Sequence, residues 1–235
     1  MDRLDDLAAD PALAAICLDV DGVLAPIVPR PEDARVPDET RAELRRLHAR
    51  YALVACVTGR AGDDAARVVG VPELLYIGEH GLERAPEAEE WRERLAAFVN
   101  SASWPRTENK GLSAGLHFRG VADEERARHE LESIASRARE IGFVARFGRK
   151  VLEIIPPLDV NKGTAIRDVL EERGLRHALY AGDDTTDLDA FRIVESLELG
   201  VRVAVASAEG PAALVEAADI VVASPEELVA LLRRL

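Results

Sequence analysis

Two aspartates, Asp19 and Asp21, stand two residues apart between the apolar run 13–18 and Gly22. Like charges at the mouth of a buried strand repel strongly. Such a pair persists mainly where a cation neutralises it or where the two carboxyl groups titrate differently. An aspartate before glycine is ordinarily turn chemistry, so the pair alone is weak evidence for catalysis. Its meaning depends on whether other polar groups join it.

Three later strand-like runs also carry polar residues at or near their ends. These are Thr58, Gly59 and Arg60 after 52–57, Lys162 within 160–166, and Asp183, Asp184 and Asp187 after 177–182. In open α/β sheets, ligands bind beyond the carboxyl ends of parallel strands, so residues far apart in sequence can meet there.

The chemistry of these groups is complementary. A small cluster of carboxylates suits Mg²⁺, which completes its shell with waters and phosphate oxygens. With the repulsion relieved, an oxygen of Asp19 can attack phosphorus and form an aspartyl phosphate. Asp21 can protonate the leaving oxygen and then activate water. Thr58 and Lys162 can bind the phosphoryl oxygens as charge develops on them.

Each group also has a structural explanation when taken singly. Thr58 could cap a helix, Lys162 could be a solvated first-turn lysine, and Asp183 could belong to an acidic turn. The stretch around Lys162 lacks the glycine-rich run of a P-loop. All four sites in this order at strand ends favour a catalytic site.

The elements that must position these residues alternate along the chain. Short apolar runs bounded by turn residues and separated by helical patterns predict a parallel sheet with helices on both faces, the α/β class. Ser224 as N-cap, with Pro225 and Glu227 after it, predicts the final helix over 224–235. The predicted strands are 13–20, 52–59, 73–78, 177–184, 201–206 and 219–223.

The middle of the chain breaks this rhythm. A charged helix, a strand, a second helix and two strands around the turn 148–150 indicate an α+β unit with antiparallel pairing. We interpret residues 83–157 as a cap domain inserted into a discontinuous core domain of residues 1–82 and 158–235.

Composition and charge limit the classes of partner that the protein is expected to bind. The formal net charge of −13 argues against nucleic acid or an anionic membrane surface as the main partner. Cys17 and Cys56 lie in apolar runs and are expected to be buried thiols. The acidic N-terminus does not resemble a signal peptide, and no apolar run approaches membrane-spanning length. We therefore expect a soluble protein of the reducing cytoplasm.

The ordered motifs resemble the haloacid dehalogenase superfamily and, within it, the trehalose-6-phosphate phosphatase family. The resemblance covers nearly the whole chain, and the motifs within 108–119 and 150–157 are the more specific ones. It implies a Rossmann-like core with an inserted C2-type cap and Mg²⁺-dependent hydrolysis of trehalose 6-phosphate. The stretches that carry it are 19–27, 57–60, 76–83, 108–119, 150–157, 161–163 and 181–191.

The resemblance also implies a role for each matching residue. Asp19 is the nucleophile and Asp21 the acid/base, with Thr58 and Lys162 as their catalytic partners. The metal is held by Asp19, Asp183 and the backbone carbonyl of Asp21, with Asp187 supporting the loop. Substrate-binding positions are Gly59, Arg60, His80, Glu108, Lys110, His117, Arg119 and Glu153, of which Glu108, Lys110 and Glu153 hold sugar hydroxyls.

The motifs depart from the family pattern at Val20, Val23 and Leu188, and none of these changes removes a catalytic group. Three alternatives stay open: a phosphatase for another sugar phosphate or a glycosyl-glycerate phosphate, a phosphomutase, and a non-catalytic sugar-phosphate sensor. The resemblance suggests functional coupling to a trehalose-phosphate synthase, and we expect a monomer.

Overall fold

The computed structural model describes residues 3–148, 150–207 and 210–235. Packing divides the chain into two compact units, residues 1–81 with 160–235, and residues 82–159. These limits lie within two residues of the predicted ones. We call the first the core unit and the second the inserted unit.

The core unit is built on a parallel sheet, which has six strands among the described residues, in the order β10-β9-β8-β1-β2-β3. All six predicted strands are present, and the predicted α/β class is confirmed. The strands are β1 (Ala14–Leu18), β2 (Leu53–Val57), β3 (Leu75–Ile77), β8 (His177–Gly182), β9 (Leu199–Val205) and β10 (Ile220–Val222).

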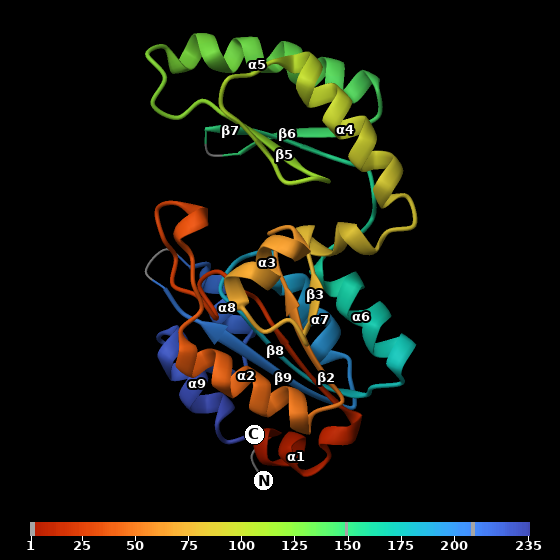
Figure 1. Ribbon diagram of the computed structural model, residues 1–235, viewed down its shortest axis with the longest axis vertical. Helices are drawn as coiled ribbons and strands as arrows, with labels where there is room; N and C mark the ends of the chain where they lie inside the picture. The colour runs from red at the N-terminus through yellow and green to blue at the C-terminus, as the bar shows by residue number, and fades with distance from the viewer. Residues whose placement is uncertain (1–2, 149, 208–209) are drawn as a thin grey trace. The chain divides into compact units, whose positions relative to one another are not determined.

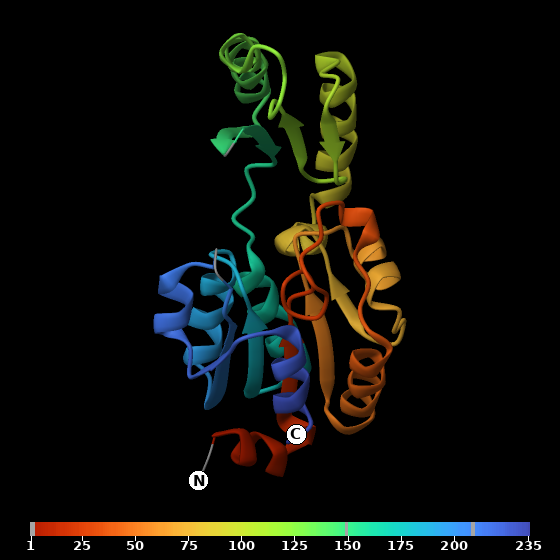
Figure 2. The same cartoon turned by 90° about the vertical axis from the view of Figure 1, so that its left-hand side faces the viewer.

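Helices cover both faces of this sheet (Figures 1 and 2). Alternate strand residues face opposite layers, so Ile16 and Leu18 pack in one core cluster while Ala15 and Cys17 pack in the other. The first layer holds α1 (Arg3–Ala9), α2 (Asp38–Arg50), α3 (Gly62–Val69) and α9 (Pro225–Leu232), and the second holds α6 (Lys162–Arg173), α7 (Asp187–Glu195) and α8 (Ala212–Ala217).

Two local predictions for this unit are confirmed. Ser224 is the N-cap of α9, and its hydroxyl accepts from the N–H of Glu227 at 3.3 Å. Cys17 and Cys56 are free, buried thiols. Burial raises the pKa of Cys17 to about 12, so this thiol is inert at neutral pH.

The inserted unit is an antiparallel sheet with helices on one face (Figure 1). Residues such as Leu116, Leu152 and Ile154 point into the core beneath the helices. The short polar strand β4, at one edge of the sheet, was not predicted from the sequence. Its order among the described residues is β4 (Thr107–Asn109), β5 (Ala114–His117), β7 (Val151–Ile155), β6 (Val144–Gly148), and the helices are α4 (Ala88–Ala102) and α5 (Glu124–Glu140).

None of the helices in the described residues has the length and apolar character needed to cross a membrane.

Candidate active site

The polar strand ends meet at the carboxyl edge of the parallel sheet. Because β1 lies between β2 and β8, Asp19, Thr58 and Asp183 follow neighbouring strands. The backbone N–H of Asp19 donates to the carbonyl of Ala181 at 3.0 Å. The predicted convergence of distant residues is therefore present for these three.

The start of α6 places Lys162. The Asn161 side chain accepts from the N–H of Thr164 at 2.9 Å, and the Thr164 hydroxyl accepts from the N–H of Asn161 at 3.0 Å. This reciprocal capping box begins the helix at Lys162. A Cβ at Gly163 would lie 2.4 Å from the carbonyl oxygen of Asp189, so only glycine permits this approach of α6 to α7.

Lys162 joins two carboxylates in the interior. Its Nζ donates to Oδ2 of Asp19 at 2.8 Å and to Oδ1 of Asp187 at 2.7 Å. The three residues have exposed fractions of only 2%, 6% and 0% for Lys162, Asp19 and Asp187. Buried charges are tolerated when they are paired and hydrogen-bonded, and these are.

Burial and neighbouring charges set the protonation of the cluster. Burial raises the pKa of Asp19 to about 6, an effect that the positive charge of Lys162 opposes. Burial alone would lower the pKa of Lys162, but Asp19 and Asp187 outweigh it and raise that pKa, so the ammonium stays charged. Burial first, then repulsion from Asp19 and Asp187, raises the pKa of Asp183 to about 7.

This cluster suits a divalent cation. One carboxylate oxygen each from Asp19, Asp183 and Asp187 lies within 4.8 Å of the others. Gly22 has φ +78°, and a Cβ there would lie 2.0 Å from Oδ2 of Asp183, so glycine lets that carboxylate lie against the turn after Asp21. The one positive charge of Lys162 does not neutralise all three carboxylates. Carboxylate oxygens are ligands that Mg²⁺ prefers.

Asp187 has a different environment from the other two aspartates. Its Oδ2 accepts from the backbone N–H groups of Asp183 and Asp184, both at 2.9 Å. Its Oδ1 accepts from Lys162 and from the hydroxyl of Tyr180 at 2.6 Å. With both oxygens so engaged, Asp187 holds the loop that presents Asp183.

Asp21 forms an ion pair that sequence reasoning did not anticipate. Arg60 donates from Nε to Oδ2 of Asp21 at 2.6 Å and from Nη2 to Oδ1 at 2.7 Å. The same guanidinium donates from Nη1 to Asp64 at 2.7 Å. The Arg60 side chain is 10% exposed, so it is fixed between the loop after β1 and the helix α3. The arginine predicted to contact substrate is here bound to the predicted acid/base.

The turn after β2 is braced by the segment after β3. The N–H of Thr58 donates to the carbonyl of Ile77 at 3.0 Å, and the N–H of His80 donates to the carbonyl of Thr58 at 2.8 Å. His80 has φ +57°, a left-handed conformation that costs energy in a non-glycine residue. A Cβ at Gly59 would lie 2.8 Å from the His80 ring, so any other residue at position 59 would displace that ring. Thr58 itself is buried.

The other predicted residues belong to the inserted unit. Glu108, Glu153 and His117 lie on the sheet face that α4 and α5 do not cover, which we call the helix-free face. Nε2 of His117 lies 3.2 Å from Oε2 of Glu108, and Nζ of Lys110 lies 3.8 Å from Oε1 of Glu108. Arg119 is exposed in the turn after β5, and its carbonyl accepts from Arg106.

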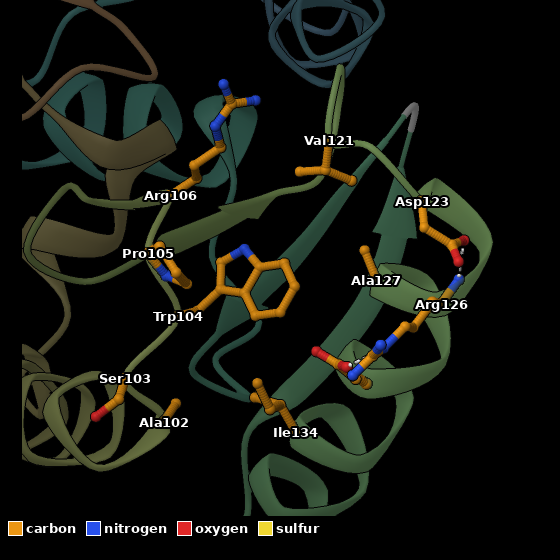
Figure 3. Close-up of a pocket in the computed structure, with 11 residues that line it drawn as sticks. Ala102, Ser103, Trp104, Pro105, Arg106, Val121, Asp123, Arg126, Ala127 and Ile134 are labelled. Carbon is orange, nitrogen blue, oxygen red and sulfur yellow. Dashed lines mark hydrogen bonds and ion pairs between the residues drawn. The ribbon is translucent and has the colours of Figure 1, made fainter.

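A pocket of about 630 Å³ lies elsewhere in the inserted unit, between the end of α4 and the start of α5 (Figure 3). Its polar groups are paired with protein partners. The indole N–H of Trp104 donates to the carbonyl of His117 at 2.9 Å, and Arg126 pairs with Glu130 at 3.0 Å. Asp123 caps α5 by accepting from the N–H of Arg126 at 2.9 Å. These contacts give the polar side chains that line the pocket a structural role.

Solved structures share the fold of this chain. The crystal structure of a trehalose-6-phosphate phosphatase related protein has a TM-score of 0.67 and 26% identity, and the match covers 93% of this chain and 95% of that one. A haloacid dehalogenase-like hydrolase from Bacteroides thetaiotaomicron has a TM-score of 0.63 at 14% identity, covering 94% and 97%. The fold is therefore that of the haloacid dehalogenase-like hydrolases.

Sequence comparison identifies the family within this fold class. The trehalose-phosphatase family matches residues 17–220. Trehalose 6-phosphate phosphatase RA3 of Zea mays is 30% identical, and the match covers 80% of this chain and 61% of that protein. This chain thus spans about three fifths of the length of that relative. The chain belongs to the trehalose-phosphatase family, as the sequence motifs predicted.

Proposed function

We propose that this protein hydrolyses trehalose 6-phosphate to trehalose and phosphate. The observation that carries the proposal is Asp19 at the carboxyl end of β1, held at 2.8 Å by the buried Lys162, in a chain of the trehalose-phosphatase family. A carboxylate oxygen fixed in this way can act as a nucleophile toward phosphorus.

In the proposed reaction, an oxygen of Asp19 bonds to phosphorus and the bond from phosphorus to the sugar oxygen breaks. Asp21 donates a proton to that leaving oxygen. Water then attacks the aspartyl phosphate, Asp21 takes up its proton, and phosphate leaves with Asp19 regenerated. Arg60 donates to both oxygens of Asp21 and so orients this carboxyl group, while the lone pairs that Arg60 does not use stay available for proton exchange.

Thr58, the backbone at Gly59 and Lys162 bind the transferring phosphoryl group. Asp19, Asp183 and the backbone carbonyl of Asp21 would hold Mg²⁺, with Asp187 ordering the loop. The ion, when bound, supplies positive charge that offsets the charge of Asp19 and of the phosphoryl oxygens. In the inserted unit, which we propose is the cap domain, Glu108, Lys110 and Glu153 bind sugar hydroxyls. His80, His117 and Arg119 complete the proposed substrate-binding set.

The test of the function is phosphate release from trehalose 6-phosphate with and without Mg²⁺. We expect release to stop in chelator and to return with Mg²⁺, while Ca²⁺, which is larger and looser in coordination, restores little. Substrates for comparison are other sugar phosphates and a glycosyl-glycerate phosphate. Full activity in chelator would exclude a metal-dependent reaction. Faster phosphate release from another substrate would show that this other compound is the preferred substrate. Isomerised sugar phosphate without free phosphate would indicate a mutase.

The metal site has a second, activity-independent measurement. Mg²⁺ at about 100 times its dissociation constant should stabilise the fold by about 2.7 kcal/mol, if only the folded chain binds it. Asp183→Asn should lose this response in a thermal unfolding assay, while Asp168→Asn, an exposed control paired with Arg167, should keep it. An equal response in both variants would place the ion elsewhere.

The sugar-binding role of Glu108 is tested by comparing two substrates. A hydrogen bond from a sugar hydroxyl to a charged group contributes roughly 1.5–3 kcal/mol. We therefore expect Glu108→Ala to lower kcat/KM for trehalose 6-phosphate by about ten- to a hundredfold. Hydrolysis of a small aryl phosphate should barely change. The matched control is Glu89→Ala, which removes an exposed glutamate paired with Arg92 on α4. Equal losses on both substrates would indicate damage to the fold instead.

A further inference from the structure

The helix-free face of the inserted unit carries one row of side chains across all the strands of its sheet. The register pairs Glu108 with Gly115, Gly115 with Glu153, and Glu153 with Arg146. Direct cross-strand partners project from the same face, so the three charged side chains share it. With neighbouring strands roughly 4.8 Å apart, the row spans roughly 14 Å. Arg146 is the one charged member of this row that the sequence motifs do not include.

Among the described residues, the guanidinium of Arg146 is paired through its Nε side with Glu153. Its Nε donates to Oε2 of Glu153 at 2.7 Å, and its side chain is 65% exposed. Within residues 3–148, 150–207 and 210–235, Nη1 and Nη2 of Arg146 make no hydrogen bond. Glu153 therefore orients the arginine and leaves its terminal donors available.

The middle of the row has no side chain, because Gly115 stands between the two carboxylates. The space above Gly115 is limited by the ring of His117, whose Nε2 would lie 3.2 Å from a Cβ at that position. Glu108, with His117 and Lys110 beside it, bounds one side, and Glu153 with Arg146 bounds the other. Val151 limits the same space, since its Cγ2 would lie 3.3 Å from that Cβ, so Gly115, His117 and Val151 form the surface between the two charged pairs.

We propose that Arg146 is a specificity-determining residue that binds the sugar part of the substrate together with Glu153, an inference that rests on the proposed function. The carboxylate of Glu153 accepts a hydrogen bond from one hydroxyl, and Nη1 or Nη2 of Arg146 donates to the oxygen of the next hydroxyl. This donor and acceptor pair matches adjacent hydroxyls of a sugar ring.

The test uses Arg146→Ala and Arg146→Lys with trehalose 6-phosphate and a small aryl phosphate. We expect Arg146→Ala to lower kcat/KM for trehalose 6-phosphate by about tenfold or more, mainly through KM, with the aryl phosphate unchanged. Arg146→Lys, which keeps a donor and a charge but not the fork, should recover part of the loss. The matched control is Arg92→Ala, which removes a partly exposed arginine whose partner Glu89 lies on α4, away from the sheet.

Three results would overturn the assignment of Arg146. The first is unchanged kinetics in Arg146→Ala while the unsubstituted protein hydrolyses trehalose 6-phosphate, which leaves the proposed function standing. The second is equal loss on both substrates, which shows a structural role. The third is the absence of trehalose 6-phosphate hydrolysis in the unsubstituted protein, which overturns the proposed function as well.

Discussion

Replacing Asp19 with Asn is expected to reduce phosphate release by at least about 10⁴-fold, because an amide is a very poor nucleophile toward phosphorus. The amide has nearly the size and shape of the carboxylate, and its single oxygen can keep one of the two hydrogen bonds that Asp19 accepts, from the N–H of Val20 at 2.7 Å or from Lys162 at 2.8 Å. Lys162 keeps its bond to Asp187. The variant should therefore fold and still bind the substrate.

The measurement is phosphate release over long incubation, with circular dichroism to verify the fold. Asp168→Asn makes the same chemical change at an exposed residue and should turn over normally. Retained activity in a clean preparation of Asp19→Asn would rule out a covalent mechanism through this residue. Loss of activity accompanied by unfolding would show that Asp19 acts as a structural partner of Lys162.

Much of the core unit was predictable because its signals are local. Runs such as 52–57 are apolar on both sides, which identifies strands buried between two helix layers. The order of these runs along the chain then brings Asp19, Thr58 and Asp183 to one sheet edge, as the structure has them. The N-cap of α9 at Ser224 was predictable for the same reason, since capping depends on residues within one turn.

The contacts that sequence reasoning missed all depend on distance in space. The pair of Asp21 with Arg60 joins residues 39 positions apart and depends on how the loop after β1 lies against α3. Strand β4 is short and polar, without alternation that could reveal it, and forms because β5 offers it a partner. Arg146 gains meaning only from the register that sets it beside Glu153.

The left-handed conformation of His80 is another feature with no local signal. The neighbouring Gly81 has φ +100°, a conformation that suits glycine, whereas His80 at φ +57° is strained. This strained conformation is stabilised by the hydrogen bond from the N–H of His80 to the carbonyl of Thr58 and by the packing of the His80 ring on Gly59. Such conformations are decided by the surrounding structure.

Lys162→Met should weaken both the fold and the activity. The substitution removes the shared cation of two buried carboxylates, Asp19 and Asp187, while nearly preserving side-chain volume. Removing one partner of a buried ion pair typically costs about 3–5 kcal/mol, since the other charge stays buried without compensation. We expect a loss of that size in urea unfolding at neutral pH. The control is Lys150→Met, an exposed lysine paired with Glu124 at 2.6 Å, which should change stability little.

The activity of Lys162→Met should fall by about 10²–10³-fold, the usual effect of removing one donor to developing negative charge. A second contribution comes from Asp19. Because Lys162 lowers the pKa of Asp19 against the effect of burial, its removal should raise that pKa above about 6, so that less of the nucleophile is ionised at neutral pH. The double variant Lys162→Met with Asp187→Asn separates the effect on stability from the effect on activity. It removes one of the two uncompensated buried charges, so it should recover part of the stability without recovering the activity. Unchanged stability in the single variant would mean that water or an ion compensates the carboxylates as well as Lys162 does.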